Sequence, residues 1–143
     1  MSAADKLYGT WRLVSWRRRL LDTDEAVEPF GGSPHGVLHY GRDGRMFFVA
    51  THEDRTAPAD PARLTDAERA RLYDTMAFYA GTFTFDGEVA RHTVDLSWNE
   101  SWNGSEQVRN VKFEAGRLIL SASIQKGLDG RPSDSVLVWE RAD

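Results

Sequence analysis

The chain has 143 residues, a length that predicts one domain over residues 1–143 with a core large enough to fold without disulfides or a structural metal. The net charge of −4 argues against a nucleic-acid partner, and the absence of cysteine excludes thiol catalysis, disulfides and Cys-ligated zinc. No segment approaches the ~18–20 consecutive apolar residues of a membrane span and residues 1–6 do not resemble a signal peptide, so we expect a cytoplasmic protein without a membrane partner.

Strand signals fill the first part of the chain. Residues 11–21 are rich in aromatic and aliphatic side chains, and residues 36–40 and 46–51 flank the turn at residues 41–44, Gly-Arg-Asp-Gly. The basic run at residues 17–19, Arg-Arg-Arg, is followed closely by acidic residues, which is typical of a solvated surface patch.

One helix is expected over residues 64–80, after the third strand. Thr65 stands three residues before Glu68, the spacing of a capping box. Apolar side chains then recur on one helical face at Leu72, Met76 and Ala80. Gly81 follows directly and is expected to end the helix.

The second half of the chain consists of strands joined by short turns. Strands are expected at residues 82–85, 89–98, 105–114, 117–124 and 135–141. Asp86-Gly87 and Ala115-Gly116 supply tight hairpin turns between them. The whole pattern predicts a mainly all-β fold, an up-and-down antiparallel barrel of about eight strands with one inserted helix. That helix could plug one end of the barrel or form the contact of a homodimer.

Period-two alternation indicates which side chains line the barrel. In residues 89–98 the inward set is expected to be Ala90, His92, Val94, Leu96 and Trp98. In residues 105–114 it is Gln107, Arg109, Val111 and Phe113. Other strands contribute Leu13, Leu38, Tyr40, Met46, Phe48, Phe83, Phe85, Leu137 and Trp139. An aromatic-rich interior with a few polar groups is the combination that a small-molecule site needs.

Three polar residues are candidates for catalysis: His92, Arg109 and Tyr79. His92 could act as a general acid or base, because the free pKa of imidazole lies near physiological pH. A buried Arg109 needs a partner, either an acid such as Asp95 or an oxygen atom of a ligand. Tyr79 or Tyr40 could donate a hydrogen bond to a developing oxyanion. The residues expected to contact the ligand are Tyr40, Met46, Phe48, Phe83, Phe85, Trp98, Gln107 and Trp139.

The structural alternatives are open for the same residues. A histidine facing a barrel interior is often a satisfied core residue, and Arg109 could lie near the rim and reach solvent. No cofactor or metal is expected: His35 and His39 would lie ~13 Å apart on a strand, too far to share one ion. Neither a P-loop nor a nucleophile-elbow sequence is present.

An early Gly9-Thr10-Trp11 and a late Arg141 resemble the lipocalin arrangement, in which the tryptophan lies at the closed end of the barrel and the arginine packs across it. The matching segments span nearly the whole chain: Gly9–Ser15, Gly36–Tyr40, Tyr79–Gly81, Val89–Val94, Gln107–Arg109 and Leu137–Arg141. In this order and spacing they resemble the bacterial and fungal lipocalin-like domain proteins, which are small calycin-type barrels. The resemblance implies structural roles for Trp11 and Arg141. Some lipocalin-like relatives act as cyclases or isomerases on polyketide-type substrates.

Three functions follow as hypotheses. The first is a cofactor-free cyclase, isomerase or lyase of secondary metabolism, with His92 as proton shuttle and Arg109, aided by a tyrosine, polarising a carbonyl. The second is a carrier or sensor that binds a small hydrophobic ligand without changing it. The third is an interaction protein whose barrel is filled by its own side chains.

Overall fold

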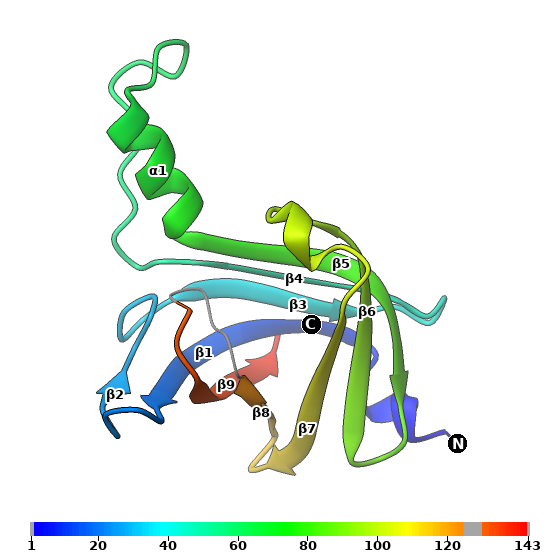
Figure 1. The fold of residues 1–143 in the computed structure, drawn as a ribbon. Coiled ribbons are helices and arrows are strands. Elements are labelled where there is room, and N and C mark those ends of the chain that lie inside the picture. Colours follow the sequence, from blue (N-terminus) through cyan, green and yellow to red (C-terminus); the bar gives the residue numbers. More distant parts are fainter. Residues whose placement is uncertain (1, 125–129, 143) are drawn as a thin grey trace.

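The computed structural model describes residues 2–124 and 130–142, whose strands form one continuous antiparallel sheet (Figure 1). The strands are β1 (Gly9–Leu20), β2 (Ala26–Val27), β3 (His35–Tyr40), β4 (Arg45–Thr51), β5 (Met76–Phe85), β6 (Val89–Ser97), β7 (Glu106–Glu114), β8 (Arg117–Ile124) and β9 (Ser133–Arg141). The helical elements are η1 (Ala3–Lys6), α1 (Asp66–Asp74) and η2 (Glu100–Trp102).

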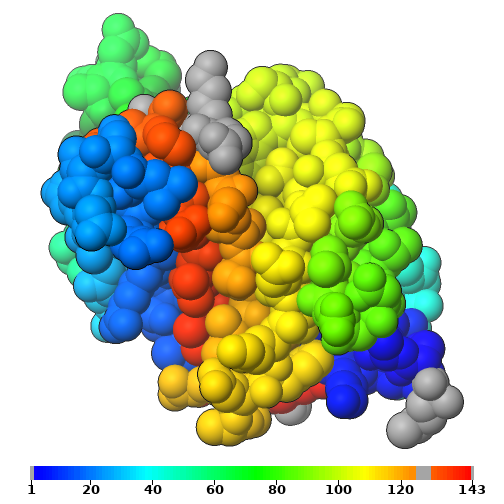
Figure 2. Space-filling model, turned by 60° about the horizontal axis from the view of Figure 1, so that its bottom comes forward, coloured from blue at the N-terminus to red at the C-terminus, as the bar shows by residue number. Residues whose placement is uncertain are grey.

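The sheet closes on itself because β1 pairs with β3 along one edge and with β9 along the other. Figure 2 shows the closure, with the blue atoms of β1 next to the red atoms of the C-terminal strand. Eight strands therefore form the closed barrel, and the short β2 extends one end of β1. This confirms the predicted up-and-down architecture, in which full closure removes exposed sheet edges.

The single α-helix, α1, follows β4, the third barrel strand, and projects away from the barrel (Figure 1). Its start is as predicted, because the Thr65 hydroxyl accepts from the Glu68 backbone and the Glu68 carboxylate accepts from the Thr65 backbone. Its end is not, because the helix stops at Asp74 and residues 76–80 form the first half of β5. Pairing with the β4 residues from Thr51 to Phe47 supplies these residues with ladder hydrogen bonds that override the local helical pattern.

A β-bulge in β6 changes which side chains face the interior. Gly81 pairs with Val94 whereas Ala80 pairs with Leu96, so Asp95 is an extra residue on β6. The alternation reverses beyond this point, and the prediction that Leu96 faces inward is wrong: the side chain is 57% exposed. Gly81, predicted to end the helix, is instead the residue of β5 at which the register shifts.

One end of the barrel is organised by the two residues on which the family resemblance rests. The guanidinium of Arg141 lies 4.0 Å from the centroid of the Trp11 ring. Arg141 also donates to the backbone oxygens of Tyr8 and Lys6, and the indole N–H of Trp11 donates to the oxygen of Leu7. The two side chains thus hold η1 against β1 and β9, which is the structural role that the resemblance implies.

Two further observations complete the fold. Phe113 was predicted to face inward, but it lies at the end of β7, is 39% exposed and meets Phe85 edge to face. In residues 2–124 and 130–142 there is no helix of the length and hydrophobicity needed to span a bilayer.

Candidate functional site

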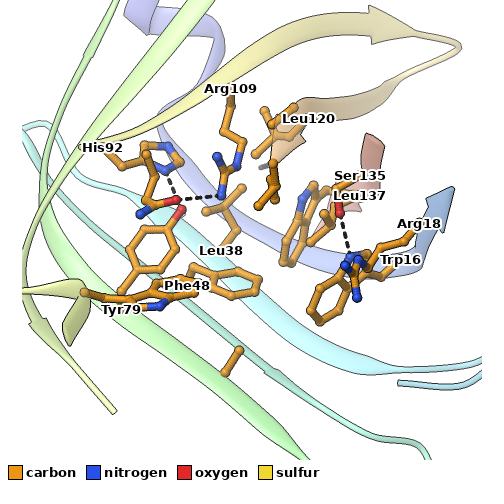
Figure 3. A pocket seen from close by; sticks show the side chains of 16 residues that line it. Trp16, Arg18, Leu38, Phe48, Tyr79, His92, Arg109, Leu120, Ser135 and Leu137 are labelled. Atoms are coloured by element: carbon orange, nitrogen blue, oxygen red, sulfur yellow. Dashed lines mark hydrogen bonds between the residues drawn. The ribbon is translucent and has the colours of Figure 1, made fainter. Parts of the chain in front are cut away.

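A cavity of about 160 Å³ lies inside the barrel (Figure 3). Its apolar lining is Trp16, Leu38, Phe48, Ala77, Trp102, Leu120, Ala122, Ile124, Leu137 and Trp139. Its polar lining is Arg18, Tyr79, His92, Gln107, Arg109 and Ser135. An apolar cavity of roughly 150 Å³ admits benzene. The enclosed space therefore suits a molecule built on one ring or a short chain.

The structure brings six of the sequence-predicted site residues together around this cavity: Phe48, Tyr79, His92, Gln107, Arg109 and Trp139. The others lie elsewhere. Tyr40 and Met46 are buried in the core, and Phe83 and Phe85 are partly buried against it. Trp98 packs edge to face on Trp102 and lines a separate surface groove instead of the cavity.

Arg18 lines the cavity, contrary to the interpretation of residues 17–19 as a solvated patch. Arg17 and Arg19 are exposed, but Arg18 is only 7% exposed and its Nε donates to Ser133 Oγ at 3.0 Å. The alternation of β1 explains the difference, because Trp16 and Arg18 lie on the inner face while their neighbours point outward.

Sequence reasoning also missed several other lining residues. Alternation within residues 117–124 carried a signal for Leu120, Ala122 and Ile124, which share one face of β8. Ala77 was missed because the predicted helix over residues 64–80 included it, whereas it lies in β5. Trp102 belongs to the short helix η2, where no strand or helix period identifies an inward side chain.

His92 occupies the centre of a buried hydrogen-bond chain. Its Nε2 lies 2.7 Å from the hydroxyl of Tyr40, and its Nδ1 lies 2.7 Å from the hydroxyl of Tyr79. All three side chains are buried, with exposed fractions of 1–3%. These residues come from β3, β5 and β6, so the hydrogen-bond chain crosses the barrel interior. It borders the cavity at Tyr79 and His92.

Burial sets the protonation states in this chain. It lowers the pKa of His92 to about 3, with a further contribution from the positive charge of Arg109. Burial also raises the pKa of Tyr40 and of Tyr79, and for Tyr79 the charge of Arg109 and a hydrogen bond from it act in the opposite direction. At neutral pH the hydrogen-bond chain therefore consists of the uncharged imidazole of His92 between two uncharged tyrosine hydroxyls, next to the guanidinium of Arg109.

Arg109 reaches the cavity from β7 and points toward Tyr79 and His92 (Figure 3). One of its terminal nitrogens donates to the backbone oxygen of Val108 at 3.0 Å, and the other donates to Gln107 Oε1 at 3.3 Å. Asp95, considered as its partner, forms a bidentate pair with Arg45 at 2.6 and 3.0 Å instead. Among the described residues, no carboxylate forms an ion pair with Arg109.

An open surface groove of about 870 Å³ adjoins the cavity. The two spaces share Arg18 and Trp102, which places the connection between the cavity and the surface at these residues. Within the described parts of the chain, no group of three or more His, Asp or Glu side chains is placed to hold a metal ion.

Comparison with known proteins gives one finding on ancestry. A family model described as a lipocalin-like domain matches residues 8–142, which is nearly the whole chain. A search of curated proteins finds no match.

Proposed function

The chain belongs to the family of lipocalin-like domain proteins, and from this premise we propose that it carries or senses a small, mostly apolar molecule held in the barrel cavity. The observation that carries the proposal is the cavity itself, because its walls are mainly aromatic and aliphatic and its volume of about 160 Å³ matches a single ring. A barrel filled by its own side chains would have no such space, so binding is favoured over a purely structural interaction role.

The proton chemistry favours binding without turnover. A general base works best when its pKa lies near the working pH, whereas burial holds the pKa of His92 at about 3. Both ring nitrogens of His92 also face tyrosine hydroxyls instead of the cavity space. These features suit a rigid wall that orients a ligand.

Titration with toluene tests the proposal. Trp16, Trp102 and Trp139 line the cavity, so a bound guest should change the tryptophan emission. We expect saturable binding, and we expect Ala122→Phe to abolish it by filling the cavity from β8. Ser121→Phe is the matched control, because Ser121 is the neighbouring residue on the opposite face of the same strand. Absence of binding to the wild-type protein, or equal binding by both variants, would contradict the proposal.

A second candidate is cofactor-free catalysis as a cyclase, isomerase or lyase, which one observation supports. The Tyr40–His92–Tyr79 hydrogen-bond chain ends at the cavity beside Arg109, so a bound carbonyl oxygen could receive hydrogen bonds from Tyr79 and Arg109 while a solvent water takes the proton from the neighbouring carbon. Incubation with acetophenone in D₂O tests this step, since enolisation exchanges its methyl protons for deuterium. Exchange above the solvent rate that is lost in Tyr79→Phe and Arg109→Gln would favour the enzyme. Exchange at the solvent rate would favour the carrier.

A further inference from the structure

The polar groups of the cavity are unbalanced in favour of hydrogen-bond donors. Two arginines, Arg18 and Arg109, line it, whereas none of the aspartates and glutamates in the described part of the chain does. Arg18 already donates to Ser133 Oγ and to the backbone oxygen of Arg131. The side-chain oxygens of Gln107 and Ser135 are already engaged, since they accept from Arg109 and from the Trp16 indole. A ligand that fills this space therefore meets the guanidinium of Arg109, which has no carboxylate partner among the described residues.

The hydrogen bonds of His92 show which tyrosine has a hydroxyl proton to offer. A neutral imidazole has one N–H donor and one acceptor nitrogen, so one tyrosine donates to His92 and the other accepts from it. In the described structure His92 is the one hydrogen-bond partner of Tyr40, which is 1% exposed and does not line the cavity. If Tyr40 accepted, its own O–H would be left buried without a partner, at a cost of about 1–3 kcal/mol.

Tyr40 therefore donates to Nε2, and Nδ1–H of His92 donates to the hydroxyl oxygen of Tyr79. This leaves the O–H proton of Tyr79 without an acceptor in the described structure. Tyr79 lines the cavity, and Arg109 lies close enough that its charge and a hydrogen bond from it act on the pKa of Tyr79. The Tyr79 hydroxyl is thus a directed donor at the same place as the guanidinium.

Arg109 has donors left over as well. Its hydrogen bonds to Val108, Gln107 and Tyr79 use three of the five N–H groups of a guanidinium. Gln107 is itself held by Ser105, whose Oγ accepts from Gln107 Nε2 at 3.0 Å. The neighbouring side chains therefore position the guanidinium, and its remaining N–H groups can donate to a planar acceptor.

A third donor belongs to another residue that lines the cavity. Nε1 of Trp139 is buried and has no hydrogen-bond partner among the described residues, and Trp139 is 0% exposed and lines the cavity. Buried polar groups in native proteins are nearly always satisfied, so this N–H adds a donor without an acceptor to the residues that line the cavity.

We propose that the cavity is built for a small apolar carboxylate, such as an aromatic or short aliphatic acid, whose carboxylate accepts from Arg109 and Tyr79 while its body fills the apolar space. The inference rests on the proposed binding function and names the ligand class. A carboxylate is favoured over a neutral carbonyl because it neutralises the guanidinium, which has no acidic partner in the described part of the chain, and because its two oxygens match the guanidinium fork.

The test compares three probes of nearly the same shape: benzoate, benzamide and toluene. We expect calorimetric titration to show benzoate binding at least tenfold more tightly than benzamide. Arg109→Gln should bring the two within about threefold of each other, and Tyr79→Phe should reduce the preference in part. Arg91→Gln is the matched control, because Arg91 belongs to the adjacent strand and pairs with Glu106 at 3.0 Å on the outer face. Its benzoate affinity should equal that of the wild type.

Toluene separates failure of this inference from failure of the binding function, and it also reports whether each variant keeps its cavity. Toluene binding without a benzoate preference, or a preference that survives Arg109→Gln in a variant that still binds toluene, would overturn the carboxylate inference alone. Loss of the benzoate preference in Arg18→Gln but not in Arg109→Gln would also overturn the carboxylate inference alone. If neither toluene nor benzoate binds, the cavity function and the carboxylate inference both fall.

Discussion

The Tyr40 hydroxyl lies 2.7 Å from Nε2 of His92, and this contact joins two strands that are not neighbours in the sheet. Tyr40 belongs to β3 and His92 to β6, with β4 and β5 between them in the strand order. The bond therefore crosses the interior of the barrel. It divides a packed region, where Tyr40 meets Phe83 edge to face, from the cavity bordered by His92.

The neutral state of His92 predicts how stability changes with pH. The pKa of His92 is about 3 in the folded chain, below the value near 6.5 expected in the unfolded chain. As the pH falls below 6.5 the unfolded chain takes up a proton that the folded chain does not, so stability is lost toward about pH 3. From about pH 8 to about pH 5 this linkage lowers the free energy of unfolding by about 2 kcal/mol.

Urea denaturation at both pH values measures this difference. His92→Gln is the control, because glutamine offers hydrogen-bonding groups to the tyrosines but does not titrate, and its stability should change less over the same range. Equal pH dependence in the wild type and in His92→Gln would mean that the buried imidazole is not the group responsible.

The two tyrosines should differ in their contribution to stability. Tyr40→Phe leaves one nitrogen of His92 buried without a partner in the packed region, which should lower the free energy of unfolding by about 1–3 kcal/mol. Tyr79→Phe removes a group that borders the cavity, where a water molecule can replace the lost acceptor, so its cost should be about 1 kcal/mol or less. Urea denaturation curves of the two variants measure the difference. A larger loss of unfolding free energy in Tyr79→Phe than in Tyr40→Phe would contradict the assigned direction of the hydrogen bonds.

The division of the barrel at His92 explains which site residues alternation could and could not identify. Alternation places a side chain inside or outside, and it correctly placed Tyr40, Met46, Phe48 and His92 inside. It does not say at which height of the barrel the free space lies. Tyr40 and Met46 are inside and fully packed, whereas Phe48 at a similar depth borders the cavity.

Local patterns failed where pairing between strands decided the outcome. Residues 76–80 carry helical spacing, but ladder pairing with β4 makes them a strand. The prediction for Leu96 is wrong because a bulge interrupts the alternation in residues 89–98. The prediction for Arg18 is wrong because it rests on the charge of the run and leaves out the alternation of the strand. The prediction of the capping box at Thr65 is confirmed, because its hydrogen bonds lie within the four residues from Thr65 to Glu68.

Arg141 should stabilise the fold in a way that lysine cannot reproduce. The guanidinium stacks on Trp11 and donates to two backbone oxygens of the N-terminal segment. A lysine cannot keep the planar stacking and the forked donation together, so Arg141→Lys should lower the free energy of unfolding by about 1–2 kcal/mol. Arg117→Lys is the control, because Arg117 forms a 4.0 Å surface ion pair with Glu140, so this substitution should change the free energy of unfolding by less than about 0.5 kcal/mol. Equal melting temperatures for the two variants would contradict this role.

Gly81 should be the least replaceable glycine of the barrel. A Cβ placed on it would lie 1.8 Å from the backbone oxygen of Thr93, and backbone cannot move aside as a flexible side chain can. Gly81→Ala must therefore distort the β5–β6 pairing at the bulge and should cost about 3 kcal/mol or more. Gly32→Ala is the control, because the nearest atom to its added Cβ is a side-chain oxygen of Glu28 at 3.9 Å.

For Gly32→Ala we expect stability between no change and a gain of about 1 kcal/mol, since alanine restricts the unfolded chain. Thermal melting of both variants measures these effects, and toluene titration of Gly81→Ala adds a second readout. The bulge sets the pairing of β6 with β5 next to Tyr79, which lines the cavity, so a variant that folds with shifted pairing should also lose toluene binding. A Gly81→Ala protein with wild-type stability and binding would show that β5 and β6 can separate at this point without cost.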